Sequence, residues 1–114
     1  MSLLHIERSR WIGFCEQLST ELVGKRAGIE IASRELGVQV EARSLPVLGF
    51  AYDSHNDIFE ILLDGLDHLI LHPREVYAEF GLNGVESLAI VDTSTWQIVV
   101  LRDPIMLAPP DALV

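Results

Sequence analysis

Cysteine is almost absent from this sequence, which has one, Cys15, among its 114 residues. A single cysteine excludes an intrachain disulfide and a cysteine-rich zinc site, and its apolar neighbours predict a buried thiol. The chain also lacks an apolar run long enough to span a membrane, and its first ten residues lack the apolar stretch of a signal peptide. We therefore expect a cytoplasmic protein without a membrane partner.

Basic residues are scarce in the second part of the chain. Residues 1–43 contain six basic and six acidic side chains, whereas residues 44–114 contain only Arg74 and Arg102 against eleven acidic side chains. The whole net charge of −9 therefore belongs to the second part. A surface of this sign repels phosphate backbones, so nucleic acid is not an expected partner. It is compatible with a cation or a basic protein.

Motifs for catalysis and cofactor binding are also missing. No serine lies in a Gly-x-Ser-x-Gly elbow, and no glycine-rich loop is present to bind a phosphate. The sequence thus indicates no catalytic residue and no cofactor, which favours a non-enzymatic protein.

The apolar content of 49% in a chain of this length predicts one domain, residues 1–114, that buries about two thirds of its unfolded surface. A helical stripe near the N-terminus predicts a helix over about residues 9–23. Ser9 is its expected N-cap and Gly24 the residue past its end. The stripe consists of Trp11, Phe14, Cys15, Leu18 and Leu22.

From Arg26 onwards the apolar residues alternate, which predicts strands. Tight turns separate them, for example at Asn83-Gly84. Two of the strands are long enough to require a bend, at Pro46 and at Pro73, because proline cannot donate to the ladder. The six predicted strands form a meander over about residues 26–103, followed by an extended tail at 104–114, and cover 26–32, 37–53, 58–63, 67–80, 85–92 and 96–102.

These elements predict a mainly β (α+β) fold, with the N-terminal helix packed on a six-stranded antiparallel meander that forms a small barrel or a strongly curved sheet. Trp11 and Trp96 are expected to anchor the core. The outline is similar to Sm-like small barrels in architecture alone, and this likeness carries no function.

Several short motifs resemble a family of short, acidic, single-domain bacterial proteins of unknown function. The motifs are Trp11 and Phe14, Tyr52-Asp53, Asp57, Glu60-Ile61, Asp67-His68, Pro73-Arg74-Glu75 and Leu101-Arg102-Asp103-Pro104. The resemblance covers nearly the whole chain. It implies a free-standing bacterial domain and supplies no catalytic residue.

The acidic segment that follows Tyr52 superficially resembles a calcium loop, with Asp53, His55 and Asp57 at its first, third and fifth positions. The sixth position is Ile58 instead of glycine, and strands flank the segment, so an EF-hand is excluded. The alternative is an ordinary turn, in which the Asp53 side chain caps the backbone and Asn56 takes a positive φ.

Two histidines further along, His68 and His72, are four residues apart in a predicted strand and thus about 13 Å apart, too far to share a metal ion. A metal site across strands remains open, with His55, Asp57, Asp67 and His68 as its candidate ligands. The carboxyl groups of Glu60 and Asp67 are candidates for acid-base chemistry.

We therefore expect a non-enzymatic binding or assembly module. Its ligand or partner face comprises Asp53, His55, Asp57, Glu60, Asp67 and His68, and its expected partner is a basic protein. An edge strand or the apolar segment Ile105-Met106-Leu107 is expected to form a homodimer. The alternative is a metal- or small-ligand-binding domain, including a hydrolase, centred on the same residues 53–68.

Overall fold

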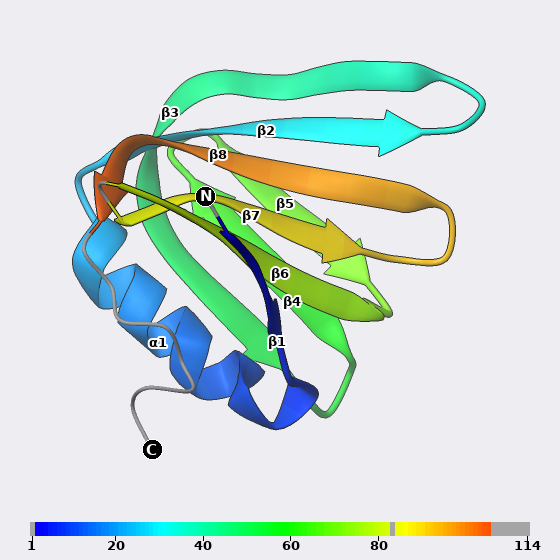
Figure 1. Ribbon diagram of the computed structural model, residues 1–114, viewed down its shortest axis with the longest axis horizontal. Helices are drawn as coiled ribbons and strands as arrows, with labels where there is room; N and C mark the ends of the chain where they lie inside the picture. The colour runs from blue at the N-terminus through cyan, green and yellow to red at the C-terminus, as the bar shows by residue number, and fades with distance from the viewer. Residues whose placement is uncertain (1, 83, 106–114) are drawn as a thin grey trace.

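The computed structural model describes residues 2–82 and 84–105. They form a 3-10 turn, one α-helix and eight strands (Figure 1). The bounds are β1 Ser2–Ile6, η1 Arg8–Arg10, α1 Trp11–Leu22, β2 Arg26–Ser33, β3 Gly37–Asp53, β4 Ile58–Leu63, β5 Leu66–Leu71, β6 Glu75–Gly81, β7 Gly84–Val91 and β8 Thr95–Ile105.

All eight strands belong to one antiparallel sheet in the order β1-β6-β7-β8-β2-β3-β4-β5. The mainly β fold with one helix is confirmed. The number of strands and the barrel are not, because β1 and β5 end the sheet without pairing with each other. The sheet is strongly curved and open within the described part of the chain.

The two additional strands are one that was not predicted, β1, and one that comes from the division of a predicted strand. β1 was not predicted, because its five residues, SLLHI, show no alternation of apolar and polar side chains and no turn-forming residues flank them. The predicted strand 67–80 is two strands, β5 and β6, of which β5 ends the sheet order and β6 is second from its other end. The chain turns between them at His72, whose φ of 54° is left-handed, and at Pro73.

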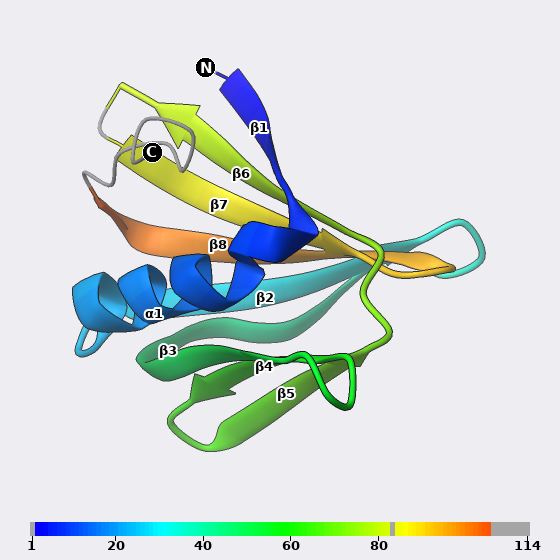
Figure 2. The same ribbon diagram turned by 90° about the horizontal axis from the view of Figure 1, so that it is seen from below.

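The predicted bend in β3 at Pro46 is confirmed, and it divides the sheet into two legs. Before the bend β3 pairs with β2, up to Arg26 opposite Pro46. After it β3 pairs with β4, starting with Val47 opposite Leu63. Figure 2 shows α1 in the opening between the two legs, of which one contains β6, β7 and β8 and the other β3, β4 and β5.

The helix packs into this opening with its predicted apolar stripe. All five residues of the stripe are buried: Trp11, Phe14, Cys15, Leu18 and Leu22. Its Ser19 hydroxyl accepts a hydrogen bond from the Phe50 backbone N–H at 2.8 Å and donates one to the Phe50 carbonyl at 2.9 Å, which fixes α1 to β3. The N-cap is Arg10 instead of Ser9, since Ser9 lies within the 3-10 turn. No helix in residues 2–82 and 84–105 has the length and apolarity that crossing a membrane requires.

The core contains one of the two tryptophans. Trp11 is 1% exposed, as predicted, and burial raises the pKa of the nearby Cys15 thiol to about 12. Trp96 is 46% exposed, so its predicted place in the core is wrong. It lies on the outer face of the sheet and stacks on Tyr77 with ring centroids 5.9 Å apart.

The end of the chain departs from the predicted tail. β8 continues to Ile105, which lies opposite Val85 of β7. The predicted docking segment lies mostly outside the described residues, because Met106 and Leu107 follow the last of them, and so does Asn83 of the predicted tight turn.

Candidate partner-binding face

The turn between β3 and β4 is held by Asp53, as predicted. Its Oδ1 atom accepts hydrogen bonds from the backbone N–H groups of His55 at 2.9 Å and Asn56 at 3.2 Å, and its Oδ2 atom accepts one from the Asn56 side-chain amide at 2.8 Å. These bonds, led by that of the amide, lower the pKa of Asp53. The left-handed residue is Asp57, with a φ of 55°, instead of Asn56.

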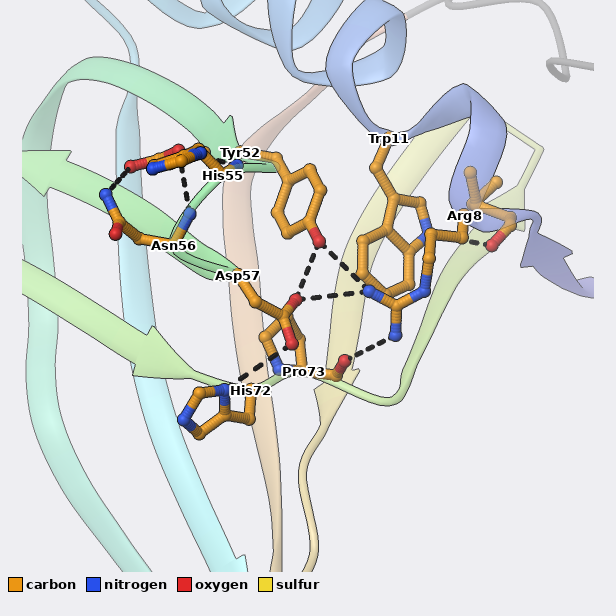
Figure 3. A network of polar contacts seen from close by, with 10 residues as sticks. Arg8, Trp11, Tyr52, His55, Asn56, Asp57, His72 and Pro73 are labelled. Atoms are coloured by element: carbon orange, nitrogen blue, oxygen red, sulfur yellow. Dashed lines mark hydrogen bonds and ion pairs between the residues drawn. The ribbon is translucent and has the colours of Figure 1, made fainter.

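Asp57 turns away from this loop towards the start of the helix (Figure 3). Its Oδ1 atom accepts a hydrogen bond from the Tyr52 hydroxyl at 2.6 Å and another from Arg8 Nη1 at 3.1 Å, and Arg8 also donates to the Tyr52 oxygen at 3.0 Å. The hydrogen bond from Tyr52, followed by that from Arg8, holds the pKa of Asp57 below its usual range. Burial and the adjacent carboxylate raise the pKa of Tyr52.

The other side of the same carboxylate meets the connection between β5 and β6. His72 Nδ1 lies 3.5 Å from Asp57 Oδ2, and the His72 backbone N–H donates to the Asp57 carbonyl at 2.9 Å. Arg8 Nη2 donates to the Pro73 carbonyl at 2.9 Å, and the Arg8 guanidinium lies 4.3 Å from the centre of the Trp11 ring. Asp57, Arg8, Tyr52 and His72, which we call the Asp57 cluster, thus join three segments that are distant in the sequence.

The next two predicted residues, Glu60 and Asp67, lie elsewhere. Along β4 the side chains of Phe59, Ile61 and Leu63 are buried, so Glu60 between them points outwards. Glu60 lies opposite Leu69 of β5, and Asp67 lies opposite Leu62 of β4. The two carboxyl groups are therefore diagonal neighbours on the outer face of the sheet, where side chains can meet.

The environment of this pair is the opposite of that around Asp57. Hydrogen bonding to the Asp67 carboxyl group is the main cause that raises the pKa of Glu60. Partial desolvation and repulsion by the Asp67 charge raise it further. No Lys or Arg occurs between residues 44 and 73. Arg8 already binds Asp57 from the opposite side of the strands.

Four exposed leucines surround the carboxyl pair, and the sequence analysis did not include them. Their exposed fractions range from 36% to 57%. Leu62 and Leu69 lie opposite the two acids, Leu71 lies further along β5, and Leu48 is in the bulge of β3 beside Leu62. We call Glu60, Asp67, Leu48, Leu62, Leu69 and Leu71 the leucine-carboxylate face. The sequences IFEILL and LDHLIL already indicate this face. Apolar residues occupy both the inward and the outward positions of these strands, whereas one buried face requires only the inward positions.

His68 points to the opposite side of β5 from Asp67, into the space between the two legs. Its Nε2 atom lies 2.5 Å from the side-chain oxygen of Gln97 on β8. The Gln97 amide group donates to Asp92 and to Thr95, both at 3.3 Å, so Gln97 is satisfied although it is only 7% exposed. His68 therefore links the two legs and does not contribute to the outer face.

The six residues predicted for one ligand or partner face thus occupy separate places. Asp53 and His55 lie in the turn, Asp57 belongs to its own cluster, Glu60 and Asp67 lie on the outer face, and His68 points inwards. Within residues 2–82 and 84–105, no group of three or more His, Cys, Asp or Glu side chains is arranged to hold a metal ion. The structure therefore does not bring the candidate metal ligands together.

Comparisons with known proteins support the family resemblance and no activity. A sequence model of the family described as "Family of unknown function (DUF5335)" matches residues 2–110. A relative from Aquifex aeolicus (strain VF5), described as "Uncharacterized protein", is 31% identical over 110 residues, which cover 96% of this chain and 99% of the relative. No solved structure matches the chain. The predicted resemblance to a family of unknown function is confirmed.

Proposed function

We propose that this chain, which belongs to the family of unknown function DUF5335, is a non-enzymatic binding module. Its leucine-carboxylate face docks a protein segment that carries an arginine or lysine between apolar side chains. The observation that carries the proposal is the carboxyl pair of Glu60 and Asp67, which lies among exposed leucines without a basic residue from its own segment.

The carboxyl pair favours a cationic partner. A guanidinium group between two carboxylates replaces their shared proton and relieves their repulsion, and hydrogen bonds to ionised groups are the stronger ones. Arginine fits best, because its planar group can donate to both carboxylates at once.

The leucines add the apolar part of the recognition. Contiguous exposed apolar side chains on a soluble protein commonly mark an interaction surface. Docking a partner over Leu62, Leu69 and Leu71 removes their area from water and surrounds the ion pair with side chains that exclude solvent. The partner is therefore an amphipathic segment with both basic and apolar residues.

A synthetic decapeptide of alternating arginine and leucine provides the probe, and a decapeptide of alternating glutamate and leucine is its control. We expect the arginine peptide to shift the leucine methyl signals of Leu62, Leu69 and Leu71 in NMR spectra. The affinity should rise as the pH increases through the raised pKa of Glu60, because Glu60 then loses its proton. The glutamate peptide should not bind.

A double variant separates recognition by this face from general attraction to an acidic protein. E60Q/D67N keeps the size of both side chains and should weaken binding roughly tenfold, which corresponds to about 1.4 kcal/mol. E16Q/E21Q removes the same charge from exposed residues of α1 and should weaken binding by less than about twofold at moderate salt. Absence of binding, or equal weakening by both double variants, would contradict the proposal.

A further inference from the structure

We infer that the free edge of β5 pairs with β5 of a second copy of this chain, antiparallel, across a two-fold axis at Leu69. This inference uses the backbone edge of the sheet and is independent of the partner that docks on the leucine-carboxylate face. It places two such faces side by side in one dimer.

The free edge of β5 is regular and carries no basic residue. β5 ends the sheet order and pairs with β4 through six consecutive residues without a bulge. Figure 2 shows it along the outer margin of its leg. Residues 66–71, LDHLIL, contain no proline, lysine or arginine. Proteins commonly use these residues, or bulges, to prevent edge strands from pairing with other chains. β5 has none of them, and Asp67 is its one charged side chain.

The other free edges of the sheet differ from β5. Residues 37–45 of β3 pair only with β2 in the described structure, but that ladder contains two register shifts, and Glu41 and Arg43 are exposed on it. β1 is regular, yet Leu3 is the one exposed leucine in Ser2–Ile6, and its neighbour on that face, His5, contacts Glu75. Among the described edges, β5 alone combines an unshifted ladder with adjacent exposed leucines, which an interface needs for its apolar centre. β3 also exposes Val38 and Val40, but its ladder contains the register shifts.

Symmetry restricts the register. A two-fold axis perpendicular to the sheet keeps each side chain on its own face. Paired residues therefore differ by an even number of positions, and one residue must lie opposite its own copy at the axis. An axis at Leu69 pairs Leu69 with the partner's Leu69, and Asp67 with the partner's Leu71. The two Asp67 carboxylates are then separated by four residue steps, about 13 Å along the strands. An axis at His68 would instead pair each Asp67 with the partner's Leu69 and bring the two Asp67 carboxylates to within two residue steps, about 7 Å along the strands.

A cysteine substitution tests this register directly. Residues directly opposite in an antiparallel pair have Cβ atoms about 5 Å apart, close to the separation of a disulfide. Under mild oxidation, L69C should therefore convert most of the protein to a covalent dimer. Cys15 can remain, because it is buried and its raised pKa of about 12 keeps it as an unreactive thiol.

Two matched variants decide between this edge and its rivals. L62C lies on the same face but one strand further in, and should remain monomeric on a denaturing gel. L3C reports on β1, the opposite edge, and should also remain monomeric. Cross-linking of L62C to the same extent as L69C would indicate random collision, and preferential cross-linking of L3C would place the interface at β1. Either result overturns the inference.

Sedimentation of the native chain gives a second, non-covalent test. Pairing of six-residue strands buries an area at the small end of stable interfaces, so a dimer is expected in the micromolar range. L69K adds a charge to the edge and should give a monomer with an unchanged circular dichroism spectrum. A native protein that sediments as a monomer at high micromolar concentration would contradict the inference. Because the peptide assay depends on Glu60 and Asp67, the docking proposal and the dimer can fail independently.

Discussion

Asp57 and Glu60 are three residues apart, yet the structure treats their charges in opposite ways. Asp57 receives hydrogen bonds from Tyr52 and Arg8, which lower its pKa. Glu60 meets another acid, Asp67, which raises its pKa. The difference follows from the side of the strands to which each points, since Asp57 turns towards the helix and Glu60 away from it.

This contrast separates a carboxylate with a base inside the fold from one beside a second acid. The Asp57 cluster uses one arginine to hold the helix start, the β3-β4 turn and the β5-β6 connection together. Glu60 instead lies beside another acid, Asp67, which makes its carboxyl group more costly to ionise. An acidic residue is therefore a better candidate for recognition when the chain supplies no base for it.

The largest expected effect concerns the base of the Asp57 cluster. Trp11→Ala should lower the free energy of unfolding by about 3–5 kcal/mol, in the range of other large-to-small core changes. Trp11 is 1% exposed, and its ring packs edge-on against that of Tyr52 with the ring centroids 4.9 Å apart. Its indole N–H donates a hydrogen bond to the Ile6 carbonyl at 2.9 Å. Urea denaturation at neutral pH measures the loss.

Trp96→Ala is the matched control for this change. Its ring is 46% exposed and contacts Tyr77 on the outer face, so its removal should cost only about 1 kcal/mol. An equal loss for both variants would show that α1 does not close the core between the two legs.

A smaller effect is expected when Asp57 loses its charge. Asp57→Asn tolerates the left-handed backbone but weakens the bonds from Arg8 and Tyr52, and should lower the free energy of unfolding by about 1 kcal/mol at pH 7. The pKa of Asp57 is lowered in the folded state. Its contribution is therefore present above the unfolded pKa and lost as the pH falls through the folded pKa.

The pH dependence provides the measurement for this variant. The difference in unfolding free energy between the native chain and D57N should be full at pH 6–7 and should shrink as the pH falls below about 4. Asp64→Asn makes the same change in the exposed turn between β4 and β5 and should have little effect at any pH. A difference that persists under acid would mean that the charge of Asp57 is not what stabilises the cluster.

The sequence allowed much of the fold to be predicted, because its signals are local. The helical stripe from Trp11 to Leu22, the bend at Pro46 and the capping by Asp53 depend on neighbouring residues, and the structure confirms all three. The six-stranded count failed where no local signal exists. Nothing in residues 67–80 indicates that five other strands separate its two halves in the sheet order.

The interior of β8 shows why the candidate site was harder to predict. A polar Gln97 beside Trp96 suggests that the tryptophan faces inwards, but in the structure Gln97 faces inwards and Trp96 outwards. Gln97 can be buried because His68, Asp92 and Thr95 satisfy its amide, and His68 is 29 residues away in the chain. Arg8 and Asp57, 49 residues apart, meet in the same way. Partners at such separations are set by the topology and not by any local pattern.

The smallest expected effect has the opposite sign from the others. Glu60→Gln replaces a carboxylate that is repelled by Asp67 with an amide that can donate to it, so it should raise the free energy of unfolding at pH 7 by up to about 0.5 kcal/mol. The pKa of Glu60 is raised in the folded state, so the stability from its shared proton is complete below the unfolded pKa and is lost as the pH rises through the folded pKa. The gain from E60Q should therefore disappear near pH 3, where the native chain keeps that proton. Glu41→Gln, at an exposed residue of β3, is the control and should change little at either pH. If E60Q lowered the stability at pH 7 instead, Glu60 would have a favourable partner within the chain, and it would resemble Asp57 more than a site kept for a basic ligand.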